Sequence, residues 1–112
     1  MTYGIALSAL SDPTRRNVFE SLRHAPRTVA EIASNQNVSR PAISQHLKVL
    51  HQAGLVSVRP VGTRRYYALR REGLADLRTY IDGFWTDILS AYAAEVEKQM
   101  GEGFDTTDQE DH

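Results

Sequence analysis

The sequence predicts a mainly α-helical domain that carries one small β-hairpin. Three observations lead to this fold class. Residues 39–54 have the start, the stop and the apolar spacing of a single helix. Residues 55–69 hold two short β-branched or aromatic runs around a loop that contains glycine, which predicts a hairpin. Residues 72–100 repeat apolar side chains every three or four positions, which predicts a long helix.

The helix predicted over residues 39–54 has clear ends. Ser39 can cap the first free amides, Pro41 lies in the first turn, and Gly54 supplies a left-handed residue at the end. The expected buried face is Ile43, Leu47, Leu50 and Gly54. The opposite face holds polar or cationic side chains and Pro41, with no acid in the segment: Arg40, Pro41, Ser44, Gln45, Lys48 and Gln52. Such a face suits phosphates and base edges.

Two helical segments begin the chain. Residues 3–10 form a short apolar segment that we expect to be helical. Asp12 is a good N-cap for a second helix, which we expect to run to about Ala25. Arg15 and Arg16 lie in its first turn, where the helix dipole disfavours cations. Their placement would be explained if they contact phosphate. It would be explained equally well if both side chains are simply solvated.

A third segment completes a helix-turn-helix. Thr28 and Glu31 have the capping-box spacing and open a helix predicted over residues 29–36. The polar turn that follows leads directly into Ser39. Two helices joined by about four residues, the second with a polar face, are typical of a helix-turn-helix that binds DNA.

The predicted hairpin would form a wing beside this motif. Its two strands are expected over residues 55–59 and 65–69, with residues 60–64 as the loop. The wing is basic, and the candidates for contact with the nucleic-acid backbone are Arg59, Thr63, Arg64 and Arg65. Exposed arginines also keep an edge strand soluble, so this feature gains weight only from its position after a cationic helix.

The long helix exposes more apolar surface than one small body can cover. About 28 residues at about 1.5 Å each extend roughly 42 Å. An uncovered stripe would be a liability on a monomer, so we interpret it as a dimer interface joined by the first helix. A core helix folded back on its own domain is the alternative. The predicted interface residues are Ile5, Leu7, Leu10, Ile81, Phe84, Trp85, Ile88, Leu89 and Tyr92.

The formal net charge of −1 conceals a segregation of charge. Residues 1–71 carry eleven Lys or Arg against three acids, whereas residues 72–112 carry two against eleven. This asymmetry suggests an anion-binding half and a half with another role. We expect one domain over residues 1–100 and a disordered acidic tail over residues 101–112.

Composition excludes several classes of protein. There are no cysteines, so disulfides, zinc–thiolate sites and thiol catalysis are excluded. No apolar run approaches the ~20 residues that cross a bilayer. The first residues carry no basic region before the apolar ones, so we expect no signal peptide and a cytoplasmic location.

Four stretches together resemble the ArsR-type winged helix-turn-helix repressors: ALSDPTRR (9–16), VSRPAISQHLKVL (38–50), AGLV (53–56) and GTRRYY (62–67). The resemblance implies a homodimer built from the first and last helices. It also implies operator DNA as the partner and repression that an effector relieves.

Metal sensing, which many members of that family perform, is not expected here. The cysteine site of the family is absent, and the last helix offers Asp76, Asp82 and Asp87 without a histidine. The four histidines are scattered along the chain: His24, His46, His51 and His112. We therefore expect neither a metal nor another cofactor.

The leading hypothesis is a homodimeric transcriptional regulator that binds an inverted repeat, with no assigned effector. The predicted DNA-binding residues are Ser39, Arg40, Pro41, Ser44, Gln45, His46, Lys48, Arg59, Thr63, Arg64, Arg65, Arg15 and Arg16. The alternatives are a metal-responsive repressor of the same fold and a non-catalytic protein-interaction winged helix. We expect no enzyme, because Ser44 and His46 point apart on a helix and no glycine-rich phosphate loop is present.

Overall fold

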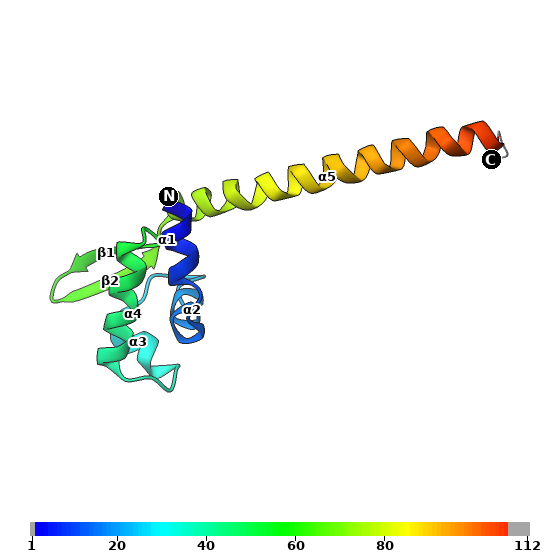
Figure 1. Ribbon diagram of the computed structural model, residues 1–112. Helices are drawn as coiled ribbons and strands as arrows, with labels where there is room; N and C mark the ends of the chain where they lie inside the picture. The colour runs from blue at the N-terminus through cyan, green and yellow to red at the C-terminus, as the bar shows by residue number, and fades with distance from the viewer. Residues whose placement is uncertain (1, 108–112) are drawn as a thin grey trace. The chain divides into compact units, whose positions relative to one another are not determined.

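The computed structural model describes the backbone of residues 2–107 and the side chains of residues 3–101. The chain divides into two units, one ending at Arg78 and the other beginning at Thr79. The elements, labelled in Figure 1, are α1 (Thr2–Ala9), α2 (Pro13–Glu20), α3 (Val29–Ser34), α4 (Arg40–Gln52), β1 (Val56–Val61), β2 (Arg64–Leu69) and α5 (Arg71–Thr107). This order confirms the mainly α-helical fold with a two-stranded hairpin that the sequence predicts.

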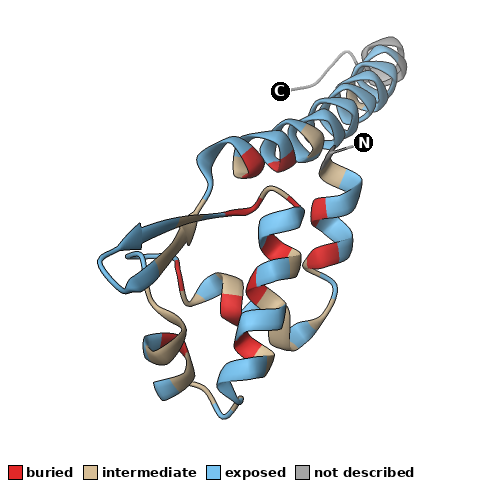
Figure 2. Ribbon diagram, turned by 90° about the vertical axis from the view of Figure 1, so that its left-hand side faces the viewer, coloured by how far each residue is buried: buried red, intermediate tan, exposed pale blue. Residues whose placement is uncertain are grey.

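Helix α4 is the centre of the first unit. It packs against α1, α2, α3 and β1. Ile43, Leu47 and Leu50 are completely buried, which confirms three of the four residues of the predicted inner face, and Gly54 is half-buried (Figure 2). Among the described residues, no polar or charged residue is buried. Apolar packing around α4 therefore forms the core. The polar face of α4 is exposed to solvent.

Both ends of α4 form as their residue types predict. The Ser39 hydroxyl accepts a hydrogen bond from the Ala42 amide at 3.3 Å. At the other end, the Gly54 and Leu55 amides donate to His51 O and Leu50 O, each at 3.0 Å. Gly54 has φ +79°, so the helix ends in a Schellman motif that requires a left-handed residue.

Helix α2 ends earlier than the sequence predicts, at Glu20 rather than near Ala25. The amides of Leu22 and Arg23 turn back to carbonyls three residues earlier, which tightens the chain. The Arg27 Nε group then donates to the Ser21 carbonyl at 2.8 Å. That carbonyl would otherwise accept the next helical hydrogen bond, so the side chain of Arg27 takes its place.

The hairpin has longer strands and a shorter loop than expected. Its antiparallel register pairs Val56 with Leu69 and Val61 with Arg64. Only residues 62 and 63 form the loop, and Gly62 has φ +65°, as the tight turns of hairpins require. The chain before α3 adds a bridge, in which Arg27 and Tyr67 exchange backbone hydrogen bonds of 2.9 and 2.8 Å. This bridge ties the wing to the helix-turn-helix.

Helix α5 continues past the predicted end near residue 100, to Thr107. No proline follows Met100, and extending an existing helix adds a hydrogen bond for each residue ordered. Residues 108–112 of the predicted acidic tail lie outside the described residues. None of the helices in the described part of the chain is both long and apolar enough for a membrane span.

Candidate nucleic-acid interface

The outward face of α4 presents the predicted reading residues to solvent. Arg40, Ser44, Gln45 and Lys48 are all exposed, as are Ser39 and Pro41 at the start of the helix. No acidic residue lies on α4. The face therefore offers hydroxyl, amide and cationic groups together, which are the groups that recognise base edges and phosphates.

The wing carries the second set of predicted residues. Arg59, Thr63, Arg64 and Arg65 are all exposed. Arg64 opens β2 directly after the two-residue loop, and Arg65 pairs with Pro60 across the hairpin. Two consecutive strand residues point to opposite faces, so the two arginines flank the strand on both sides.

A groove of about 480 Å³ joins the helix to the wing. Ser44 of α4 lines it together with Arg64 and Arg65 of β2. The structure thus brings together two segments that the sequence assigns separately to DNA.

The same groove contains residues that were not predicted as part of the interface: Thr28, Val29, Ala30, Glu31 and Tyr67. The carboxylate of Glu31 accepts from the Thr28 amide at 2.9 Å, and the Thr28 hydroxyl accepts from the Glu31 amide at 3.2 Å. The predicted capping box is therefore confirmed. The predicted helix-turn-helix already indicated that the start of α3 would lie near α4, because the two helices form that motif together.

His46 faces a different neighbour from the other predicted residues of α4. It is half-buried, and its charge helps to lower the pKa of Asp12 at the start of α2. The largest cause of that lowered pKa is the hydrogen bond from the Arg15 amide, at 3.1 Å, and the Thr14 amide adds another at 2.8 Å. Slight burial opposes these effects. His46 therefore lies on the α2 side of the helix.

Arg15 and Arg16 are engaged within the chain. The Nη1 atom of Arg15 donates to Ala9 O at 3.2 Å, and its Nη2 atom lies 3.8 Å from the Asp12 carboxylate. The Nη1 atom of Arg16 donates to Leu10 O at 2.8 Å. The sequence suggested either phosphate contact or simple solvation, and it did not reveal these bonds to the end of α1.

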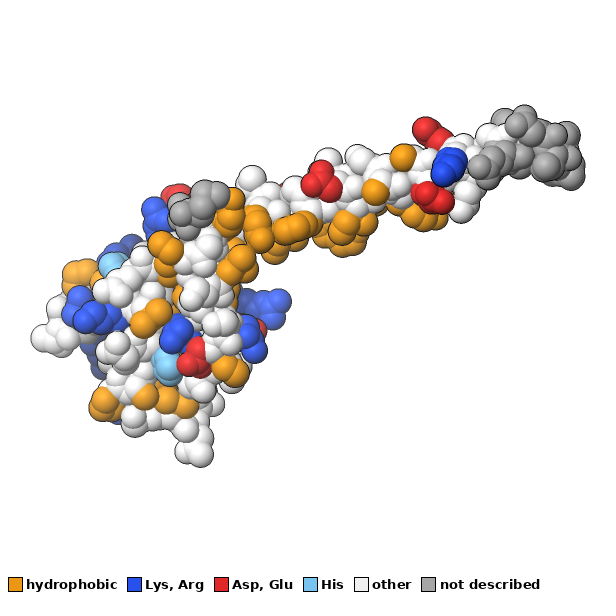
Figure 3. Space-filling model, in the orientation of Figure 1, with side chains coloured by type: hydrophobic (Ala, Val, Ile, Leu, Met, Phe, Trp, Pro, Cys, Tyr) orange, Lys and Arg blue, Asp and Glu red, His pale blue; other side chains and the backbone are white. Residues whose placement is uncertain are grey.

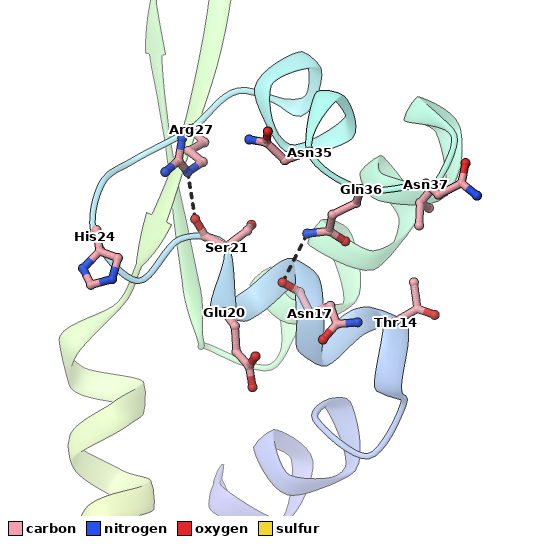
Figure 4. A pocket seen from close by; sticks show the side chains of 10 residues that line it. Thr14, Asn17, Glu20, Ser21, His24, Arg27, Asn35, Gln36 and Asn37 are labelled. Carbon is pink, nitrogen blue, oxygen red and sulfur yellow. Dashed lines mark hydrogen bonds between the residues drawn. The ribbon is translucent and has the colours of Figure 1, made fainter.

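A cleft of about 660 Å³ lies between α2 and the turn at residues 35–38 (Figure 4). Its lining residues include several with amide or hydroxyl side chains. The Nε2 atom of Gln36 donates to the Asn17 carbonyl at 3.3 Å, which joins the two walls. This bond holds the turn that leads into α4.

The predicted dimer residues divide between the two units. In the first unit, Ile5 and Leu7 of α1 are 59% and 40% exposed, whereas Leu10 packs against the core. In the second unit, the apolar side chains of α5 are 48–68% exposed: Ile81, Phe84, Trp85, Ile88, Leu89 and Tyr92. Figure 3 shows hydrophobic side chains following one side of this helix. Within the described residues, no three His, Cys, Asp or Glu side chains gather as metal ligands would.

Comparison with known proteins identifies the family. The sequence profile described as "Bacterial regulatory protein, arsR family" matches residues 12–58. The HTH-type transcriptional regulator Rv2034 of Mycobacterium tuberculosis is 54% identical over 101 residues, which cover 90% of this chain and 92% of that protein. The transcriptional repressor SdpR of Bacillus subtilis is 41% identical over 68 residues, covering 61% of this chain and 76% of that protein.

The fold also matches a solved structure. That structure is described as the homodimeric winged helix-turn-helix DNA-binding domain of Mb0332 from Mycobacterium bovis, a possible ArsR-family transcriptional regulator. The match has a TM-score of 0.63 and 27% identity, and it covers 80% of this chain and 83% of that one. From the sequence matches and the observed helix-turn-helix and wing, we conclude that this chain belongs to the arsR family of bacterial regulatory proteins and has the winged helix-turn-helix fold.

Proposed function

We propose that this protein is a homodimeric transcriptional repressor that binds an inverted-repeat operator through α4 and the wing. The groove shared by Ser44, Arg64 and Arg65 is the observation that carries the proposal. It joins a helix face that suits base edges to a hairpin that suits phosphates. A duplex seated on α4 would therefore also meet the wing. The relatives named as a regulator and a repressor support the same function.

The residues divide into readers and anchors. Ser44 and Gln45 lie at the middle of the exposed face of α4, and glutamine pairs well with adenine in the major groove. Arg40 near the helix start reaches guanine or phosphate. Lys48, Arg64 and Arg65 neutralise phosphates, which supplies affinity without sequence choice. Ser39, Pro41 and Thr63 border these groups, whereas His46 lies on the α2 side of α4.

A second copy of the chain would cover the apolar side of α5 and the exposed residues of α1. Six large apolar side chains of α5 are each about half exposed, and monomeric proteins rarely leave so much contiguous apolar surface in contact with water. The solved relative titled as a homodimer supports this assembly. Two α4 helices would then enter successive major grooves about 34 Å apart, as a palindromic site requires. Chromosomal DNA as the target places the protein in the cytoplasm, and the proposal requires no catalytic step.

Selection from a pool of genomic duplexes tests the proposal. The expected result is enrichment of an inverted repeat with a centre-to-centre spacing of one helical turn. Gln45→Ala combined with Arg64→Ala should abolish this enrichment while the dimer persists, measured by light scattering. The proposal fails if no duplex is retained at low salt. If the double variant instead keeps its affinity for DNA, α4 and the wing are not the surface that binds DNA, and the proposal is contradicted.

A further inference from the structure

The short link between α1 and α2 solves a hydrogen-bonding problem for α1. The last carbonyls of a helix have no partner within the helix. Here the Ser8 carbonyl accepts from the Ser11 amide at 3.1 Å and from the Ser11 hydroxyl at 2.7 Å. The next two carbonyls, Ala9 O and Leu10 O, accept from Arg15 and Arg16. The end of α1 is therefore completed by side chains of α2.

Electrostatics explains why arginines occupy the first turn of α2. Their charge is unfavourable at the start of their own helix and favourable at the carbonyl end of α1. Asp12 offsets the cost at α2, because its carboxylate lies 3.8 Å from the guanidinium of Arg15. It also caps α2 through the amides of Thr14 and Arg15. The arginines thus stand between two helix ends of opposite polarity.

Helix α1 depends on such contacts to keep its place. It has eight residues, fewer than the roughly 12 that an isolated helix needs in water. Its two buried side chains, Ala6 and Ala9, are small and are 2% and 4% exposed, and Tyr3 adds a partly buried contact with the core. Residues of α1 and α4 line a common groove of about 410 Å³, with Val49 and Ala53 on the α4 side. A movement of α1 would therefore reach the helix that is proposed to read DNA.

We propose that Arg15 and Arg16 are positioning residues that couple contact between subunits to operator binding. They fasten α1, which exposes Ile5 and Leu7 toward a second subunit, to the helix-turn-helix. Their effect on DNA passes through α1 and α4, with no contact to phosphate. The predicted effect on operator binding rests on the proposed function. The predicted attachment of α1 by the two arginines does not depend on that function.

Three variants and two measurements test the coupling. Arg15→Gln and Arg16→Gln each remove a guanidinium, and the backbone amide of residue 15 still donates to the Asp12 carboxylate that caps α2. Arg23→Gln is the matched control, because it removes the same charge from an exposed residue that follows α2. The first measurement is amide hydrogen exchange of the free proteins. The second is affinity for the selected duplex at several salt concentrations.

The coupling predicts that exchange of the α1 amides becomes about tenfold faster in Arg16→Gln, since one charged hydrogen bond is removed. Exchange of the α4 amides should stay unchanged in Arg16→Gln. In the control Arg23→Gln, exchange should match that of the wild-type protein throughout. Affinity for the duplex should fall about tenfold, and the slope of log affinity against log salt should stay at its wild-type value. Dimer dissociation should also increase in both Arg15→Gln and Arg16→Gln.

Two results would overturn the inference. One is unchanged exchange in α1, which would show that the arginines do not hold the helix. The other is a salt slope reduced by roughly 0.9 for each substituted arginine, which would mean that the arginines bind phosphate. If the wild-type protein binds no duplex, the proposed function fails, and the exchange and dimer measurements still decide the coupling. If Arg15→Gln does not fold, Arg16→Gln alone gives the answer.

Discussion

Gly73 of α5 lies directly against the backbone of Gly54, the residue that ends α4. A β-carbon at position 73 would overlap the Gly54 carbonyl oxygen and would come within 3.3 Å of the Leu55 α-carbon. The Arg70 amide also donates to Leu55 O at 2.9 Å. The backbone at the start of α5 therefore lies directly against the backbone at the end of α4, and the Nη1 atom of Arg70 adds a hydrogen bond of 3.4 Å to Gly54 O.

This close approach predicts that Gly73→Ala destabilises the protein by about 1–3 kcal/mol, because backbone rather than a flexible side chain would have to move. The free energy of unfolding in urea, at a fixed protein concentration, measures the effect. Gly83→Ala is the matched control on the same helix, since among the described residues nothing beyond the adjoining turns of α5 lies within 4 Å of a β-carbon placed there. It should be neutral or stabilise by up to about 1 kcal/mol through helix propensity. Equal effects of the two variants would contradict the packing argument.

The lowered pKa of the Asp12 carboxyl predicts how the stability of the protein depends on pH. Hydrogen bonds from the Arg15 and Thr14 amides, together with the charges of Arg15 and His46, hold its pKa below the ordinary value of 3.8. A carboxyl with a lowered folded-state pKa stabilises the protein above its unfolded-state pKa, and this stability is lost as the pH falls through the folded-state value.

Asp12→Asn isolates this effect, because the amide oxygen can still cap α2 while the charge is absent. Above about pH 4 the wild-type protein should be more stable than Asp12→Asn. The difference in the free energy of unfolding should shrink as the pH falls further. A difference that stays constant from neutral to strongly acidic pH would rule out the charge of Asp12 as its source.

Trp85 is the single tryptophan and reports on the proposed subunit contact. Its side chain is 57% exposed in one chain, so burial by a second copy should shift its emission to shorter wavelength. Dilution of the wild-type protein should reverse this shift as the dimer dissociates. Leu89→Asp should emit like the diluted protein and sediment as a monomer. Asp87→Asn, two residues away on the polar side, should remain dimeric; an identical loss in both variants would contradict an apolar interface.

The roles of α4 and the wing can be separated by their response to salt. Arg64→Gln should lower affinity for all duplexes and reduce the salt slope by roughly 0.9 for each phosphate that is no longer neutralised. Gln45→Ala should leave the slope unchanged and relax the preference at one base pair, by about 1–3 kcal/mol. Competition between the selected operator and single-base variants measures that preference. A salt slope that changes with Gln45→Ala would assign Gln45 to the backbone instead.

Features that depend on neighbours in the sequence were predicted well. The Ser39 cap, the Thr28–Glu31 capping box and the left-handed Gly54 each involve residues at most a few positions apart. The apolar period of α4 likewise identified its buried face, since that period is a property of the helix alone. The helix-turn-helix and the wing followed from their order along the chain.

Features that depend on contacts between elements were missed. The early end of α2 requires the guanidinium of Arg27 to reach Ser21, and the roles of Arg15 and Arg16 depend on the angle between α1 and α2. Gly73 gave no signal, because a glycine in a helical pattern does not reveal what lies beside it. The groove that joins Ser44 to the wing also appears only when the hairpin folds back toward α4.

The most direct test of the central claim is the affinity of the wild-type dimer for its selected palindrome across a range of salt concentrations. Lys48, Arg64 and Arg65 from two subunits would neutralise about six phosphates, which predicts a log–log slope of about −5. Binding should weaken sharply when one half-site is scrambled. An affinity that is independent of salt, or equal for the palindrome and the scrambled duplex, would contradict operator recognition by α4 and the wing.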